Sequence, residues 1–192
     1  SFITVYYIGE KNIFVLLLLI GFFYLLLKSL EQFRNKTKNF AQIFSHTGFS
    51  LLLISILLNS FSSKEIVKNI QVGESFILKN EKVIFKKITV EKEKNYESII
   101  GLFEILDEKN KIINLQPEIR IYNEPKMATS EASIKTSLFK DRFITINIIK
   151  DQNFFNVRYQ HKPFMIWIWI STLIIIIGGL FAIFRKNKEV SI

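Results

Sequence analysis

The sequence predicts a membrane protein of mixed class, in which an all-β domain, sandwich or barrel-like, is inserted between the second and third of three transmembrane α-helices. Three nearly charge-free apolar runs, at residues 12–30, 40–60 and 163–184, have about the length that crosses a bilayer, roughly 17–25 residues. Residues 61–162 instead mix charges of both signs with many β-branched side chains. About a hundred residues suffice for an independent core.

Residues 61–162 contain repeated segments of strand length, separated by turn residues such as Lys79-Asn80. Alternation of apolar and polar side chains is clearest from Arg142 onward. This pattern is typical of a compact antiparallel sandwich or barrel. The predicted strands are residues 74–78, 82–91, 97–107, 111–122, 131–137, 142–150 and 154–159.

Basic residues indicate the sidedness of the chain. They concentrate around the short loop at residues 31–39 and in the tail at residues 185–192, namely Lys28, Arg34, Lys36, Lys38, Arg185, Lys186 and Lys188. Short loops rich in Lys and Arg stay on the inner side of a membrane. We therefore expect residues 1–11 and the β domain at residues 61–162 to lie on the outer side.

The composition excludes several function classes. The net charge of the 192 residues is +9, but much of it lies at the membrane edges, which disfavours nucleic acid as a partner. The chain has no cysteine, so it forms no disulfide and performs no thiol exchange itself. It begins with Ser1 rather than Met, so we expect a fragment or a split-off carboxyl-terminal portion of a longer protein.

A polar stripe marks the second apolar run. At about 100° per residue, Asn39, Gln42, His46 and Ser50 lie close together on a helical wheel, whereas the far side is apolar and includes Gly48. An ionisable side chain in hydrocarbon is costly unless it has a partner. We therefore expect the stripe to face protein or a cofactor, with His46 as the candidate ligand.

Two interpretations of His46 stay open from the residues alone. One is a neutral imidazole that is hydrogen-bonded to a neighbouring helix. The other is a metal ligand, and a lone helical histidine matches axial ligation of haem iron better than a zinc or copper site. A second axial ligand at the same depth would then have to come from another polypeptide, because His161 and Met165 lie at the opposite edge of the membrane.

The remaining candidates have plain structural explanations. Glu118 and Arg120 are two residues apart and are expected to pair on one strand face. His161 is expected to be an interfacial anchor. Trp167 and Trp169 belong to an aromatic belt and are about 200° apart on the wheel, so one should face lipid and the other protein. We find no familiar enzyme motif.

Several short motifs follow one another in a characteristic order and spacing. They are Ser45-His46-Thr47-Gly48, Gly73-Glu74, Asn95-Tyr96, residues 117–122, residues 131–134, Asp141-Arg142-Phe143, residues 162–169 and Gly178-Gly179. Through these motifs the chain resembles, from residue 40 to residue 184, the carboxyl-terminal region of CcmF, a cytochrome c-type biogenesis protein of the haem lyase family.

The resemblance implies a role in attaching haem to the CXXCH motif of apocytochrome c. It implies that His46 is one axial ligand of a b-type haem. We assign Gln42, Gly48 and Ser50 on the same helix as supporting residues. The other supporting residues that we assign are Trp167, Trp169, Glu118 and Arg120. The family's second ligand and its tryptophan-rich haem-handling segment belong to earlier parts of the family sequence, so catalysis is not assigned to this chain.

The resemblance also implies partners and a location. The partners are the amino-terminal portion or subunit of the haem lyase, other cytochrome c maturation proteins, apocytochrome c and membrane lipid. The location is a bacterial or mitochondrial inner membrane. The alternative function is a non-enzymatic, membrane-anchored β domain that serves as scaffold or chaperone for an exported partner. A transporter is disfavoured, since no broken helix is evident.

Overall fold

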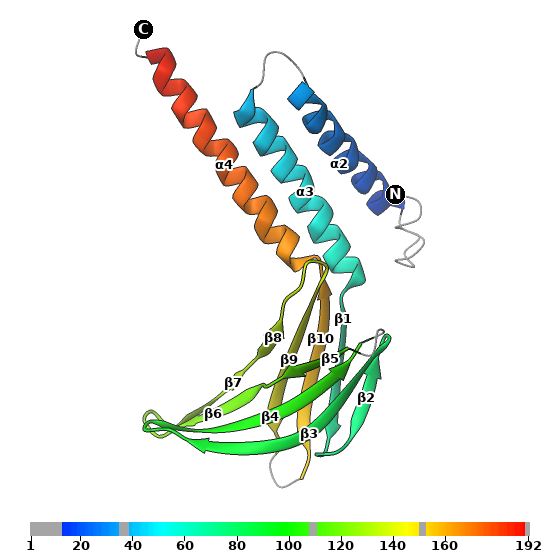
Figure 1. The fold of residues 1–192 in the computed structure, drawn as a ribbon, viewed down its shortest axis with the longest axis vertical. Helices are drawn as coiled ribbons and strands as arrows, with labels where there is room; N and C mark the ends of the chain where they lie inside the picture. Colours follow the sequence, from blue (N-terminus) through cyan, green and yellow to red (C-terminus); the bar gives the residue numbers. More distant parts are fainter. Residues whose placement is uncertain (1–12, 35–38, 108–110, 150–152, 191–192) are drawn as a thin grey trace. The chain divides into compact units, whose positions relative to one another are not determined.

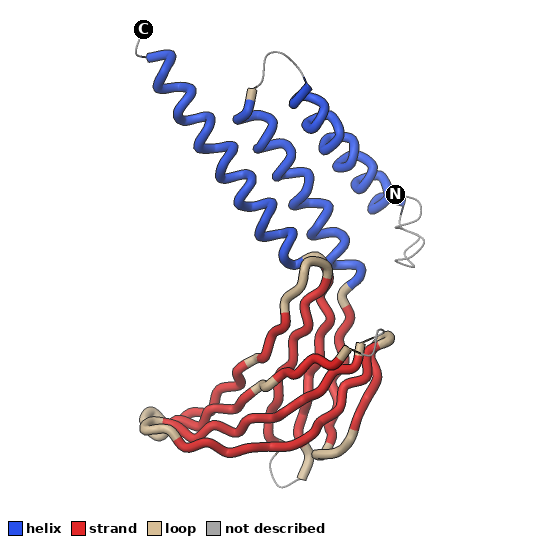
Figure 2. The backbone as a smooth tube through the Cα atoms, viewed as in Figure 1, coloured by secondary structure: helices blue, strands red, loops and turns tan. Residues whose placement is uncertain are grey.

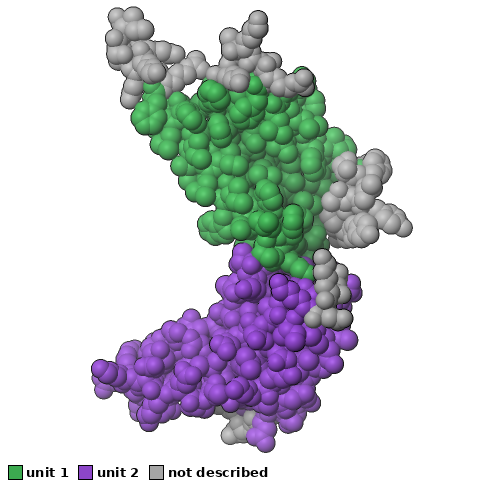
Figure 3. Space-filling view, in the orientation of Figure 1, with its two compact units in different colours: residues 1–62, 137–140, 163–192 green, residues 63–136, 141–162 purple. Residues whose placement is uncertain are grey.

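The computed structural model describes residues 13–34, 39–107, 111–149 and 153–190. The outer segment predicted at residues 1–11 lies outside the described residues. The chain forms two compact units, which Figure 3 shows in two colours. The helical unit comprises residues 1–62, 137–140 and 163–192, and the β unit comprises residues 63–136 and 141–162. Figure 2 shows the helices and strands of the described residues.

The helical unit contains α2 (Ile13–Glu31), the short η1 (Gln32–Arg34), α3 (Phe40–Ser62) and α4 (Met165–Val190). The helix α3 lies between α2 and α4 and contacts both (Figure 1). Among the described residues, two helical segments are long and apolar enough to cross a membrane, Phe40–Ser62 and Met165–Phe184. A crossing by α2, with its 19 residues, stays a prediction.

The helix α4 is longer than the third predicted span. It continues through residues 185–190, which we expected to form a separate basic tail. The sequence Arg-Lys-Asn-Lys-Glu-Val contains no Gly or Pro that would end a helix. The backbone therefore stays helical beyond the apolar segment.

The β unit is built from two antiparallel sheets. One has the order β1 (Lys64–Ile70), β10 (Phe155–Pro163), β9 (Lys140–Ile148) and β8 (Ser133–Lys135). The other has the order β2 (Ser75–Leu78), β3 (Glu81–Lys92), β4 (Tyr96–Leu106), β6 (Glu118–Tyr122) and β7 (Met127–Glu131), and β5 (Ile112–Leu115) also pairs with β4.

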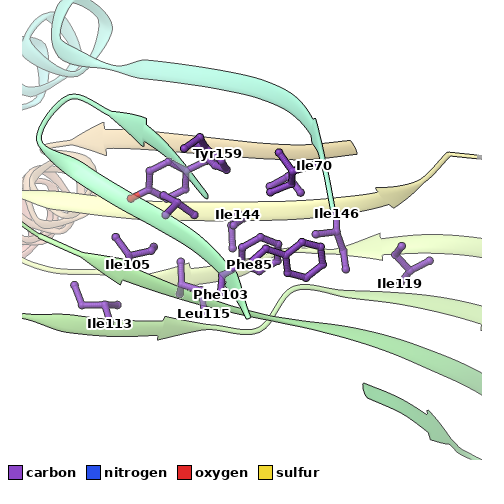
Figure 4. Close-up of a cluster of buried hydrophobic side chains, with 13 residues drawn as sticks. Ile70, Phe85, Phe103, Ile105, Ile113, Leu115, Ile119, Ile144, Ile146 and Tyr159 are labelled. Carbon is purple, nitrogen blue, oxygen red and sulfur yellow. The ribbon is translucent and has the colours of Figure 1, made fainter. Parts of the chain in front are cut away.

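A single apolar core joins the two sheets (Figure 4). The rings of Phe85 and Phe103 stack with their centroids 4.4 Å apart. Side chains from both sheets surround this stack: Ile70, Phe76, Val83, Ile105, Ile113, Leu115, Ile119, Ile144, Ile146, Val157 and Tyr159. Of the two forms that the sequence predicts, the structure is therefore the sandwich.

Several strand predictions need correction. The predicted strand at residues 111–122 is two strands, β5 and β6, because Pro117 has no N–H to donate to a ladder. Its carbonyl still accepts a hydrogen bond of 2.9 Å from the Gly101 N–H of β4. The strands β1 and β7 were not predicted. The turn at Lys79-Asn80 is confirmed, and Lys79 has a φ of 53°, as tight hairpins require.

Candidate functional site

The predicted polar stripe begins with a helix cap at Asn39. The side-chain oxygen of Asn39 accepts a hydrogen bond of 3.4 Å from the backbone N–H of Gln42. The Asn39 carbonyl accepts one of 3.0 Å from the N–H of Ile43. The first turn of a helix leaves such N–H groups without partners, and Asn is a favoured capping residue. This cap fixes where α3 begins and places Gln42 and His46 one turn apart on the same face.

His46 lies on the open face of α3. His46 and Gln42 are both exposed, and Phe49, one turn further along, is 49% exposed. The described parts of α2 and α4 cover other faces of α3. The imidazole is therefore accessible from outside the helical unit, as far as the described residues show.

Ser50 does not share this exposure. Its side chain is fully buried, and its Oγ donates a hydrogen bond of 2.7 Å to the carbonyl of His46. Serines commonly bond back to their own helix in this way. The neighbouring buried residues on this side of α3 are Ile43 and Ile54. The exposed polar stripe thus consists of Gln42 and His46, and Ser50 bonds to the backbone behind them.

Small residues bring α3 and α4 into close contact. A Cβ atom at Gly48 would lie 2.9 Å from the carbonyl oxygen of Ser171 and 2.7 Å from Cγ1 of Ile175. A Cβ atom at Gly178 would lie 2.6 Å from the backbone nitrogen of Ser45. Membrane helices that approach closely use such residues at their interface. Gly48 therefore lies where α3 packs closely against α4, on a face of α3 that His46 does not share.

The two tryptophans of α4 differ in their surroundings. Trp167 is partly buried, and its ring centroid lies 6.4 Å from that of Phe139. Trp169 is 67% exposed. Of the pair that we expected to face different environments, Trp167 is the one that packs against protein. Neither is shown in contact with His46.

Glu118 and Arg120 form the predicted pair on β6. A Glu118 carboxylate oxygen accepts a hydrogen bond from Arg120, and the other accepts one from the Ser98 hydroxyl. The Arg120 guanidinium lies 5.2 Å from the ring centroid of Tyr96. The hydrogen bond from Arg120 outweighs partial burial and holds the pKa of Glu118 below its ordinary value. The pair belongs to the β unit, whereas His46 belongs to the helical unit.

A buried ionic cluster in the β unit was missed by the sequence analysis. Arg142 donates from Nη2 and Nε to one oxygen of Glu81, at 2.6 and 3.0 Å. The Tyr159 hydroxyl donates to the other oxygen at 2.6 Å. Burial, reinforced by Glu81, raises the pKa of Tyr159. The available signal was the alternation of β9, which places Arg142 on the inward face with Ile144 and Ile146.

Among the described residues no group of three or more His, Asp or Glu side chains could hold a metal ion. The chain's other histidine, His161, lies in β10, where its Nδ1 is 3.5 Å from Nζ of Lys79. A metal centre that uses His46 would therefore take at most two ligands from the described His, Asp and Glu side chains. Axial ligation of haem fits that arrangement, whereas a structural zinc site needs four protein ligands.

Comparisons with known proteins agree on one family. Residues 60–163, more than half of the chain, match the family described as the CcmF C-terminal beta-sandwich. The cytochrome c-type biogenesis protein CcmF of Haemophilus influenzae is 25% identical over 154 residues, which are 80% of this chain and 24% of that protein. The probable cytochrome c-type biogenesis protein NrfE of Escherichia coli is 25% identical over 145 residues, 76% of this chain and 26% of that protein.

A solved structure shows the same fold. The cytochrome c heme lyase CcmF matches with a TM-score of 0.58 and 15% sequence identity, over 73% of this chain and 24% of that one. The chain thus spans about a quarter of the length of the relatives that it matches. By its sandwich and by the sequence match across it, the chain belongs to the CcmF family and corresponds to the C-terminal region of its members.

Proposed function

We propose that this chain is the C-terminal part, or a subunit, of a cytochrome c haem lyase, and that His46 is an axial ligand of a b-type haem. The relatives named above support the role in cytochrome c biogenesis. The observation that supports the ligand role is the exposure of His46 on a membrane-length helix with no other ionisable side chain. Among the described residues, the His46 ring has no hydrogen-bond partner and is not covered by a helix.

The exposure of His46 matters because of its surroundings in a membrane. An imidazole without a partner in hydrocarbon costs several kcal/mol, so intramembrane histidines are normally paired or liganded. If α3 crosses the bilayer, the open face that carries Gln42, His46 and Phe49 must be covered by something that satisfies the ring. Ligation of haem iron by His46 would satisfy the ring, and Phe49 would line the same face.

The residues of this chain would hold and orient such a haem on one side. The Asn39 cap and the close contact at Gly48 set the rotation of α3, and Ser50 bonds to the carbonyl of His46. The opposite axial ligand belongs to another polypeptide or to the portion of the family that this chain lacks. Bound haem iron would supply one-electron redox chemistry at that place.

The proposal includes an arrangement in the membrane. The helices α2, α3 and α4 are the three predicted crossings, and the β unit lies on the outer side of a bacterial or mitochondrial inner membrane. The basic residues at the inner ends of the apolar runs support this orientation. The partners are then the amino-terminal portion of the lyase, other cytochrome c maturation proteins and apocytochrome c. Glu118 and Arg120 act as a structural pair.

The decisive experiment uses the two histidines as a matched pair. The chain is co-produced with the amino-terminal portion of a CcmF relative, and the membranes are examined by reduced-minus-oxidised absorption spectroscopy. We expect a b-type spectrum that His46→Ala abolishes and that His161→Ala leaves intact. His46→Gly should regain the spectrum when free imidazole is added, since imidazole can replace the missing ligand.

An unchanged spectrum in the His46→Ala variant would refute the ligand role. The alternative, a membrane-anchored scaffold, would then be favoured. Co-purification separates the two: the haem lyase portion and apocytochrome c should accompany the tagged chain under the proposed function, and should be absent under the scaffold function.

A further inference from the structure

The turn between β8 and β9 belongs to the helical unit rather than to the β unit. The turn comprises Ser137, Leu138, Phe139 and Lys140. Ser137 closes it, because its N–H and its Oγ both donate to the carbonyl of Lys140, at 3.1 and 2.6 Å. Its Oγ also accepts a hydrogen bond of 3.3 Å from the N–H of Lys140. Leu138 and Phe139 therefore form the tip of a closed turn.

This tip is attached to the start of α4. The carbonyl of Phe139 accepts a hydrogen bond of 3.2 Å from the N–H of Phe164. The Phe139 ring centroid lies 6.5 Å from that of Phe164 and 6.4 Å from that of Trp167. The tip and the first turn of α4 therefore lie at nearly the same depth in a membrane that α4 crosses.

The length of α4 sets that depth. Its apolar segment Met165–Phe184 has 20 residues, which at about 1.5 Å per residue span about 30 Å, the thickness of the hydrocarbon core. The first turn of α4 therefore lies at the boundary between headgroups and acyl chains. The exposed indole of Trp169, one turn inward, is typical of that boundary.

The tip has the composition of a membrane-binding surface. Leu138 is 58% exposed and Phe139 is 61% exposed, although both side chains are large and apolar. Lys135 and Lys140 lie on the two sides of the tip in the sequence. Apolar side chains flanked by lysines suit an anionic bilayer surface, because the ammonium groups meet lipid phosphates while the apolar groups enter the acyl region.

We propose that the β8–β9 turn inserts Leu138 and Phe139 into the lipid at the level where α4 enters the bilayer. The occupant of this surface is phospholipid rather than another protein, because the tip is bonded to the first turn of α4, where the apolar segment of that helix would enter the bilayer, and carries exposed apolar side chains between two lysines. The inference needs α4 to cross a membrane, but it does not need haem or the ligand role of His46.

The absence of cysteine from the sequence makes a direct test simple. Leu138→Cys and, separately, Phe139→Cys would be labelled with a nitroxide in the full chain, reconstituted in vesicles of phosphatidylethanolamine and phosphatidylglycerol. Electron paramagnetic resonance would then measure collisions with oxygen, which concentrates in lipid, and with a water-soluble nickel chelate. The matched control is Lys126→Cys, at an exposed turn residue of the β unit.

We expect the oxygen-to-nickel collision ratio at residues 138 and 139 to be several-fold higher than at residue 126. A ratio equal to that at residue 126 would show that the tip lies in water and would overturn the proposal. Low collision rates with both reagents would show that protein covers the tip, and would overturn it as well. The two label positions are independent, so misfolding of one variant leaves the other to decide.

Discussion

In the β unit the buried carboxylate of Glu81 is bound by Arg142 and Tyr159 from another sheet, whereas in the helical unit the buried hydroxyls of Ser50 and Ser171 bond to carbonyls of their own helices. The backbone explains the difference. A helix in lipid pairs its backbone N–H and C=O groups internally. A serine hydroxyl on it therefore donates a second hydrogen bond to a carbonyl that already accepts one from the backbone. In a sandwich, the inward side chains of the two sheets contact each other across the core, and a charged group buried there needs a hydrogen-bond partner.

The two units also differ in how many of their buried polar atoms lack a hydrogen-bond partner. Four buried side-chain polar atoms in the described residues have no hydrogen-bond partner, and three of them are in the helical unit, namely Ser29 Oγ, Thr47 Oγ1 and Trp167 Nε1. The fourth is Arg120 Nε in the β unit. The helical unit also carries the exposed His46. Among the described residues, buried polar atoms without a partner are therefore concentrated in the helical unit.

Glu81→Ala should destabilise the β unit more than any other change considered, because it removes a carboxylate that binds two buried side chains. Arg142 would lose its nearest counter-charge and keep only the more distant carboxylate of Asp107, 3.8 Å away. Breaking a buried ion pair costs about 3–5 kcal/mol. We expect the protection of β3 and β9 amides against hydrogen exchange to fall by two or more orders of magnitude, since each 1.4 kcal/mol or so is a factor of ten. The measurement is hydrogen-exchange mass spectrometry on the full chain in detergent.

The matched control is Glu97→Ala in the same unit. Glu97 pairs with Lys92 at 3.0 Å, but the two side chains are 45% and 78% exposed. Exposed pairs contribute about 0–1 kcal/mol, so protection should change less than tenfold. Equal losses in the two variants would contradict the structural role assigned to the Glu81 cluster.

Gly178→Ala tests the helical unit in the same way, with a smaller expected effect. The new methyl group would lie 2.6 Å from the backbone nitrogen of Ser45, so α3 and α4 would have to separate. Overpacking of this kind costs about 1–3 kcal/mol. We expect a lower thermal midpoint of the helical signal in circular dichroism.

Gly179 provides the control for that prediction. A Cβ atom at Gly179 meets nothing within 4 Å among the described residues. Replacing Gly by Ala inside a helix should stabilise it by up to about 1 kcal/mol. The two substitutions should therefore change the stability of the helical unit in opposite directions. A gain in stability for Gly178→Ala would show that α3 and α4 are not in contact at this residue.

The sequence predicted the helices and an all-β domain, sandwich or barrel-like, because hydropathy and strand-length patterns are local properties. It did not predict β1, whose residues Lys64–Ile70 are mostly exposed and are defined by pairing with β10. The helical wheel placed Gln42 and Ser50 at equal angles on either side of His46. Only the positions of neighbouring helices decide which of those two is covered, so the burial of Ser50 could not be derived from the wheel.

The Glu81 cluster was hidden from the sequence for a related reason. Glu81 follows a turn and stands among lysines, so it resembles a solvated residue. Its burial depends on Arg142 and Tyr159, which are 61 and 78 positions away in the chain. The Glu118–Arg120 pair was predictable because both partners lie on one strand, two residues apart.

The smallest expected effect is the pH dependence that Glu118 adds to the β unit. Because Arg120 lowers the folded-state pKa of Glu118 from its ordinary value of 4.5, the unfolded chain binds this proton at a higher pH than the folded chain does. The stabilisation is therefore complete above pH 4.5 or so and is lost as the pH falls through the lowered folded pKa. Glu65, held by Arg158, has a lowered pKa too and adds a contribution of the same sign.

Glu118→Gln should remove only the contribution of Glu118 to this pH dependence, which is less than about 1 kcal/mol between about pH 6 and pH 3. The measurement compares the unfolding midpoints of the variant and of the unmodified chain over that pH range. A variant whose midpoints fall with acid as steeply as those of the unmodified chain would mean that solvent, not Arg120, governs this carboxylate.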